Sequence, residues 1–138
     1  MIFKKILLII FLELSLFANS VYNSNILDLQ AKVFPKIILL DNNFEDKLIK
    51  NIAVITILYE EIDYNIAETL KEKIEKNYNS LKDYNLEVNI SKYSAFDINN
   101  LSTAYIFLLG KEDKILETSK ILTNNSRLSF AYNNSYLD

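Results

Sequence analysis

Three acidic residues offer the most direct chemistry in this sequence. Glu60, Glu61 and Asp63 come straight after a continuously apolar run at residues 52–58. Carboxylate oxygens at the carboxyl end of a buried parallel strand could hold a hard cation, contact a ligand or support hydrolysis. The simpler interpretation, which we favour, is a solvent-exposed turn in which Asp63 caps the next helix. We therefore expect no metal and no catalytic residue, and keep the acidic turn as a candidate ligand contact.

The residue types that are missing exclude more chemistry than the acidic residues suggest. The 138-residue chain has no Cys, no His and one Gly, Gly110. It therefore has no thiolate nucleophile, no imidazole base or imidazole metal ligand, and no glycine-rich loop that could hold a phosphate. We expect a protein that is not an enzyme and uses no cofactor.

Composition and charge also limit the partners. Half of the residues are hydrophobic, which is enough for a packed core. Lys and Arg number 15 against 18 Asp and Glu, a formal net charge of -3. Because neutralised phosphates supply most nucleic-acid affinity, a mildly acidic chain without a basic stripe is not expected to bind nucleic acid.

The first eighteen residues have the pattern of a secretory signal peptide. Lys4 and Lys5 precede an apolar segment at residues 6–17, and Ala18 offers a small residue for cleavage. The alternative is an uncleaved anchor, but twelve helical residues span only about 18 Å of a core that is about 30 Å thick. We expect export to the periplasm, with the membrane contacted only through the signal peptide or a partner.

Residues 19–138 are expected to form a single α/β domain. Its centre is the run at residues 52–58, which lacks alternation and so predicts a strand buried on both faces. Periodicity predicts helices at residues 24–40, 64–81 and 111–124, and further strands at residues 86–91, 103–109 and 128–132. This order predicts a mainly parallel, Rossmann-like sheet with helices on both faces, preceded by an N-terminal helix. Residues 133–138 are turn-like, so we expect the closing strands to be missing or to come from a partner.

The first expected helix is unusually apolar. One stripe recurs at three- and four-residue spacings, and further residues broaden it: Ile26, Leu29, Val33, Ile37 and Leu40, then Phe34, Ile38 and Leu39. Pro35 is expected to end or kink this helix near Phe34. We favour core packing for the stripe, with contact to a partner as the alternative.

Four residues are candidates for a protein interface. Phe34 and Ile38 lie on the broadened face of the first helix, and Tyr93 and Phe96 follow the alternating strand at residues 86–91, which is expected at the outside of the sheet. Exposed aromatic residues are enriched at interfaces. Ordinary packing beneath a loop is the alternative for the two aromatic residues.

The order of the elements resembles a known family. A helix ends in Phe-Pro-Lys-Ile-Ile-Leu-Leu at residues 34–40, and the strand at residues 52–58 leads into the helix at residues 64–81. A polar connector precedes Leu-Ser-Thr-Ala-Tyr-Ile-Phe-Leu at residues 101–108, and a helix end and strand follow at residues 122–132. In these features the chain resembles the YfiR/HmsC-like family of small periplasmic regulatory proteins, over most of residues 24–138.

The resemblance implies a non-enzymatic periplasmic regulator, commonly a homodimer. It implies binding to the periplasmic part of an inner-membrane signalling protein, of the diguanylate cyclase or sensor kinase type, and so a role in cyclic-di-GMP signalling. The alternative is a periplasmic single-lobe domain that binds a small ligand at the carboxyl ends of its strands.

Overall fold

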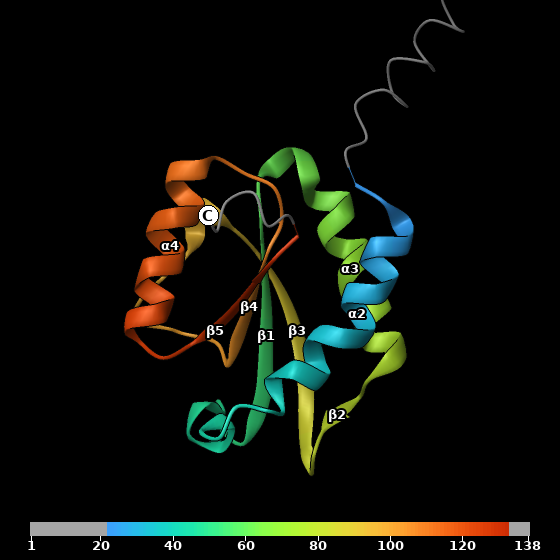
Figure 1. Ribbon diagram of the computed structural model, residues 1–138, viewed down its shortest axis with the longest axis vertical. Coiled ribbons are helices and arrows are strands. Elements are labelled where there is room, and N and C mark those ends of the chain that lie inside the picture. Colours follow the sequence, from blue (N-terminus) through green and yellow to red (C-terminus); the bar gives the residue numbers. More distant parts are fainter. Residues whose placement is uncertain (1–21, 133–138) are drawn as a thin grey trace, which may run out of the picture.

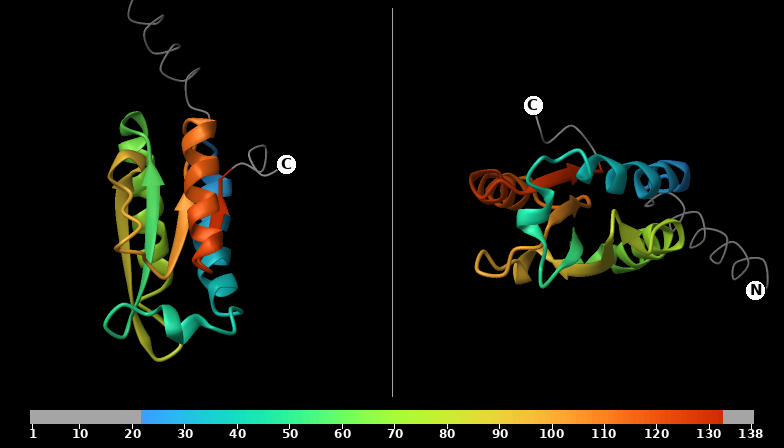
Figure 2. Two further views of the ribbon diagram at one scale, coloured as in Figure 1. Left: turned by 90° about the vertical axis from the view of Figure 1, so that its left-hand side faces the viewer. Right: turned by 90° about the horizontal axis from the view of Figure 1, so that it is seen from below.

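The structure is a computed structural model and describes residues 22–132. Within them, a five-stranded sheet lies between α2 and α3 on one face and α4 on the other (Figures 1 and 2). The helices are α2 (Ser24–Ile38), α3 (Tyr64–Asn77) and α4 (Glu112–Asn124), with short 3-10 helices η1 (Phe44–Lys47), η2 (Glu61–Asp63) and η3 (Tyr93–Ala95). The strands are β1 (Ile52–Tyr59), β2 (Ser80–Leu81), β3 (Tyr84–Lys92), β4 (Ala104–Phe107) and β5 (Leu128–Ala131).

The sheet is parallel except at one edge. Its strand order is β2-β3-β1-β4-β5, and only the short β2 runs antiparallel to its neighbour. The central position of β1 fits its composition, because Ile55 lies opposite Val88 on one side and Ala104 on the other. The expected α/β class with a mainly parallel sheet is confirmed. The expected signal peptide and the turn at residues 133–138 lie outside the described residues.

Two apolar cores fill the space between the layers. The larger core joins α2 and α3 to one face of the sheet, where Ile55, Ile57 and Ile106 are fully buried. The smaller core joins α4 to the other face and contains Phe107 and Ile115. Strands β1 and β4 therefore bury both faces, as the unbroken apolar run of β1 predicts.

Two helix boundaries differ from expectation. Helix α2 continues through Pro35 to Ile38, and the proline is buried against the core, so packing outweighs the lost backbone hydrogen bond. Helix α3 ends at Asn77 instead of residue 81, because Tyr78 is extended and Ser80–Leu81 pairs with β3. The connector after β3 forms one short 3-10 helix, η3, directly after the strand.

The connector from β3 to β4 contains no helix beyond η3. It passes over the α4-side face of the sheet as a loop, which Figure 2 shows beside the much broader cover that α4 provides. The α4-side face of β3 is therefore left exposed at Glu87 and Asn89, whereas their partners on β1, Val54 and Thr56, are buried.

Candidate functional site

The acidic residues at the carboxyl end of β1 lie in a turn with no buried residue, the favoured interpretation, and do not assemble into a site. Asp63 is the N-cap residue of α3, but its side chain makes no capping hydrogen bond. Glu61 forms an exposed ion pair with Lys92 at 3.4 Å, and Asp63 accepts a hydrogen bond from the Tyr22 hydroxyl at 2.8 Å. Glu60 points toward Gly110, where its Cγ would lie 3.3 Å from an added Cβ. The three acidic side chains thus lie beside three different parts of the chain. Within residues 22–132, no group of three acidic, His or Cys side chains is placed to hold a metal ion.

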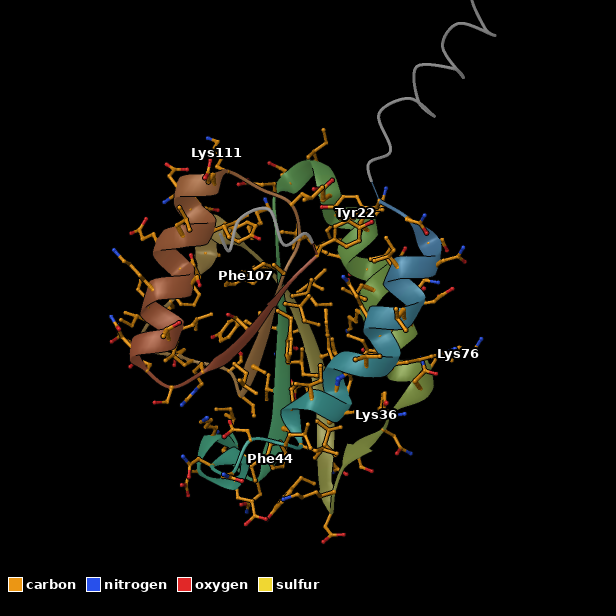
Figure 3. All side chains as sticks on the ribbon, viewed as in Figure 1. Tyr22, Lys36, Phe44, Lys76, Phe107 and Lys111 are labelled. Carbon is orange, nitrogen blue, oxygen red and sulfur yellow. The ribbon has the colours of Figure 1, made fainter. Side chains whose placement is uncertain are left out.

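Tyr22 occupies the carboxyl end of the sheet instead, beside the upper ends of the strands (Figure 3). Its hydroxyl donates to Asp63 and accepts the backbone N–H of Leu109 at 2.9 Å. Burial and the Asp63 carboxylate raise the pKa of Tyr22 above its usual range, so the hydroxyl remains protonated and keeps donating. The Tyr22 ring also packs on Tyr132, with centroids 4.7 Å apart.

The single glycine belongs to the same crowded end. A Cβ at Gly110 would lie 2.9 Å from Cε2 of Tyr93, closer than real contacts allow. Tyr93 is itself buried, and its hydroxyl donates to the Leu108 carbonyl oxygen. Close packing of aromatic rings therefore requires glycine here, and this crowding opposes the small-ligand pocket expected at the strand ends.

The four expected interface residues are mostly inside the molecule. Ile38 and Tyr93 are buried, contrary to the expectation of exposed contacts. Phe34 is half-buried and stacks on Phe130 with centroids 4.5 Å apart, and Phe96 is half-buried against Tyr105. The physical reason is that these apolar side chains complete the two cores of their own chain.

The apolar stripe of α2, in contrast, faces outward. Its members are Ile26, Leu29, Val33 and Ile37 on α2 and Leu40 just after the helix, which together we call the outer stripe. Leu29 is 61% exposed and Leu40 is 78% exposed. Two residues turn a helix by about 200°, so buried Ala31 and exposed Val33 lie on opposite sides of α2. The expectation that this stripe packs into the core is wrong.

A groove lies next to the outer stripe, between α2 and the sheet edge. It has a volume of about 440 Å³ and is lined by Leu29, Gln30, Val33, Phe34, Ala131 and Tyr132, among others. Within the described part of the chain, β5 is the outermost strand at this edge. Gln30 is buried, and its Oε1 has no hydrogen-bond partner among residues 22–132, although its Nε2 donates to the Tyr132 carbonyl oxygen at 3.4 Å.

This arrangement suits binding rather than catalysis. Apolar side chains supply area, and the unpaired carbonyl oxygen of Gln30 can accept a donor from a bound chain. Sequence reasoning missed Gln30 and Tyr22, because a lone amide and a tyrosine before a helix form no recognisable motif. The apolar stripe could be read from the sequence, but whether it faces the core or the solvent could not.

None of the helices within residues 22–132 combines the length and apolar character that crossing a membrane would require. Comparison with protein-family models, with curated proteins and with solved structures gave no match for this chain.

Proposed function

We propose that this chain is an exported, non-enzymatic regulator that binds the periplasmic part of an inner-membrane signalling protein. The resemblance to the YfiR/HmsC-like family motivates the class of partner. The observation that carries the proposal is the outer stripe of α2, whose large aliphatic side chains are exposed in the isolated chain. Monomeric proteins rarely expose a long contiguous apolar surface without a partner for it.

The groove beside the stripe supports a protein segment as the bound partner. The outer side of β5 offers backbone groups that can pair with an added strand, as in recognition by strand addition. Gln30 Oε1 offers an acceptor in the floor of the groove for a backbone or side-chain N–H. A polypeptide can supply both donors and apolar side chains, so it fits this surface better than a small apolar molecule does.

The finer description of the fold belongs to the same proposal. We infer that the sheet is Rossmann-like, because β3 and β4 lie on opposite sides of β1 and the helices that connect the strands cover both faces of the sheet. In such sheets ligands commonly bind at the carboxyl ends, where the order of the strands reverses. Here Tyr22 and Tyr93 crowd that position, which favours a regulator over the single-lobe ligand binder.

The test is crosslinking in cells followed by capture of the tagged mature chain from the envelope fraction and mass spectrometry. The variant Leu29→Glu places a charge in the middle of the outer stripe. Leu116→Glu is the matched control, because Leu116 is also a half-exposed leucine, at 45%, but lies on α4. We expect capture of an inner-membrane cyclase or sensor kinase by the wild type and by Leu116→Glu, and loss of that capture in Leu29→Glu.

Two results would contradict the proposal. Capture that survives in Leu29→Glu would show that the outer stripe is not the contact surface. Recovery of only a second copy of the chain would assign the surface to a homodimer in place of a membrane signalling partner.

A further inference from the structure

A cavity lies beneath the connector from β3 to β4, away from the outer stripe. It has a volume of about 620 Å³, within the range of small-molecule sites. Its floor is the start of β1, including Ile52 and Val54, and its wall includes residues 98–102 of the connector. A hollow of about 260 Å³ adjoins it and shares Asn89, Asn100 and Ser102. The cavity exists because a thin loop, rather than a helix, crosses this face.

Arg127 gives this cavity a fixed positive group. Its Nε donates to the Ser102 carbonyl oxygen at 3.0 Å, and its Nη1 donates to the Asn125 carbonyl oxygen at 3.2 Å. These two bonds hold the guanidinium in place while leaving three of its five N–H groups for other acceptors. Arg127 forms no ion pair with any carboxylate in residues 22–132. The charge of Arg127 contributes to lowering the pKa of the Asp41 carboxyl, but Asp41 forms its ion pair with Lys47.

The remaining lining combines amides with an excess of positive charge. Lys50 and Arg127 contribute two cations, and Glu87 is the one acidic residue in the lining that the described part of the chain supplies. The neutral polar groups are three asparagine side chains and one serine hydroxyl: Asn89, Asn99, Asn100 and Ser102. Among residues 22–132, no aromatic ring lines this cavity. An anion with several hydroxyl groups therefore matches it better than a flat aromatic ligand.

We propose that this cavity binds a small hydroxylated carboxylate of the sugar-acid class, with its carboxylate on Arg127 and its hydroxyls on the asparagine amides. A guanidinium held by backbone carbonyls matches the two oxygens of a carboxylate. The Asn89 and Asn99 amides can donate to and accept from hydroxyl groups, and Asn100, whose Nδ2 already donates to the Asp97 carboxylate at 2.8 Å, offers its carbonyl oxygen. Ile52 and Val54 face the C–H surface of the ligand. This site is independent of the proposed regulatory surface on α2.

The charge balance distinguishes this class from its nearest alternatives. A neutral sugar would use the amides but leave the Arg127 guanidinium without its ionic partner. An amino acid would bring a positive group into a cavity that already holds two cations and one anion. Electrostatic attraction of the ligand also predicts that binding weakens as the salt concentration rises.

The test is titration of the folded mature chain with glucuronate, galacturonate and gluconate, followed by NMR and calorimetry. Glucose and alanine serve as the neutral and zwitterionic comparisons. We expect at least one of the three acids to bind at least tenfold more tightly than glucose or alanine. We also expect the side-chain amide signals of Asn89 and Asn100 to shift during the titration.

Arg127→Gln should weaken binding of the acid at least tenfold. Lys76→Gln is the matched control, because it removes one positive charge from α3 on the other side of the sheet (Figure 3). If Arg127→Gln fails to fold, Asn89→Ala replaces it as the test, since this exposed β3 side chain forms none of the hydrogen bonds described above. Asn89→Ala should weaken acid binding by about threefold or more.

Three outcomes would overturn the proposal. Glucose binding as tightly as the acids would remove the role of the carboxylate. Signal shifts confined to the groove between α2 and β5 would place the ligand elsewhere. Absence of binding by all three acids at millimolar concentration would reject the site, whatever the variants do.

Discussion

The two faces of helix α2 are both apolar, yet they have opposite surroundings. Leu27, Ala31 and Ile38 face the sheet and are buried, while Leu29 and Val33 of the outer stripe face away. The inner face includes a small residue, Ala31, with no exposed surface, which allows α2 to approach the core closely. The outer face has large aliphatic residues at regular spacing. An apolar stripe on a helix therefore indicates a contact surface but does not show whether the chain itself or a partner covers it.

Polar contacts along α2 join it to α3 and to the segment after β4 in the orientation that buries Leu27 and Ala31. The hydroxyl of Tyr78, the residue that follows α3, donates to the Lys32 carbonyl oxygen at 2.5 Å. Lys73 of α3 forms an ion pair with Asp28 of α2. Near the start of the helix, the Tyr22 hydroxyl accepts the backbone N–H of Leu109, two residues after β4. These contacts join residues that are far apart in sequence. A helical pattern contains no information about them.

The sharpest test of the comparison uses two neighbouring isoleucines. Ile38→Ala should lower the free energy of unfolding by about 2–5 kcal/mol, because it removes a fully buried side chain and leaves a cavity. Ile37→Ala removes the same atoms from the outer stripe and should cost about 1 kcal/mol or less. Urea unfolding of both variants measures the difference. Equal losses would mean that both faces of α2 are covered within the folded chain.

The second test concerns the tyrosine that fixes the start of α2. Tyr22→Phe should cost about 1–3 kcal/mol, because Leu109 loses the acceptor of its N–H and Asp63 loses a donor. Tyr64→Phe is the control, since Tyr64 is half-exposed at the surface of α3 and should change stability by about 0.5 kcal/mol or less. Thermal unfolding of the two variants provides the measurement. A null effect at Tyr22 would mean that packing against Tyr132 alone orients this segment.

Much of this architecture can be predicted from the sequence. The unbroken run of β1 requires burial on both faces, and the 3.6-residue period of α3 sets its inner face through Leu70 and Ile74. These patterns depend on local chemistry, so the α/β class and the helix and strand positions follow from them. The short β2 was missed, because two residues carry no periodicity.

The candidate surfaces were predictable only in part, for a physical reason. Each depends on contacts between distant residues: Arg127 reaches the carbonyl of Ser102, and Gln30 reaches that of Tyr132. Tyr93 shows the same limit, since nothing local indicates that its hydroxyl reaches Leu108. Apolar and aromatic residues reveal that a surface will be buried. Whether the chain itself or a partner buries it is decided by tertiary packing.

The third test measures how stability depends on pH through Asp41, in the segment that follows α2. Burial of Asp41 would by itself raise the pKa of that carboxyl, but hydrogen bonds from Lys47 and from the Asn43 N–H, with the Lys47 charge, lower it below its ordinary 3.8. A lowered pKa in the folded state stabilises the protein above the unfolded value, and this stabilisation is lost as the pH falls through the folded pKa. The loss should be modest, because a protonated carboxyl keeps an oxygen that can accept from Lys47.

Urea unfolding between about pH 5 and pH 2 checks this expectation. The free energy of unfolding should fall with acid in the wild type and fall less steeply in Asp41→Asn. Part of the slope should remain, because the pKa values of Asp28 and Asp97 are also lowered, chiefly by hydrogen bonds from Lys73 and from the Asn99 N–H. An unchanged slope in Asp41→Asn would mean that the ion pair near the end of α2 contributes nothing to the acid response.

The smallest expected change in stability is at the outer stripe, and it tests the comparison most directly. Leu29→Glu should alter the free energy of unfolding by about 0.5 kcal/mol or less, because the side chain already faces solvent in the isolated chain. Thermal unfolding of the dilute protein measures this, and size-exclusion chromatography shows whether the variant changes its state of association. This variant tests association with little expected change in stability, whereas a substitution on the buried face would change both. A loss of several kcal/mol in the dilute monomer would show that the outer stripe packs within the chain, and its role as a partner surface would have to be abandoned.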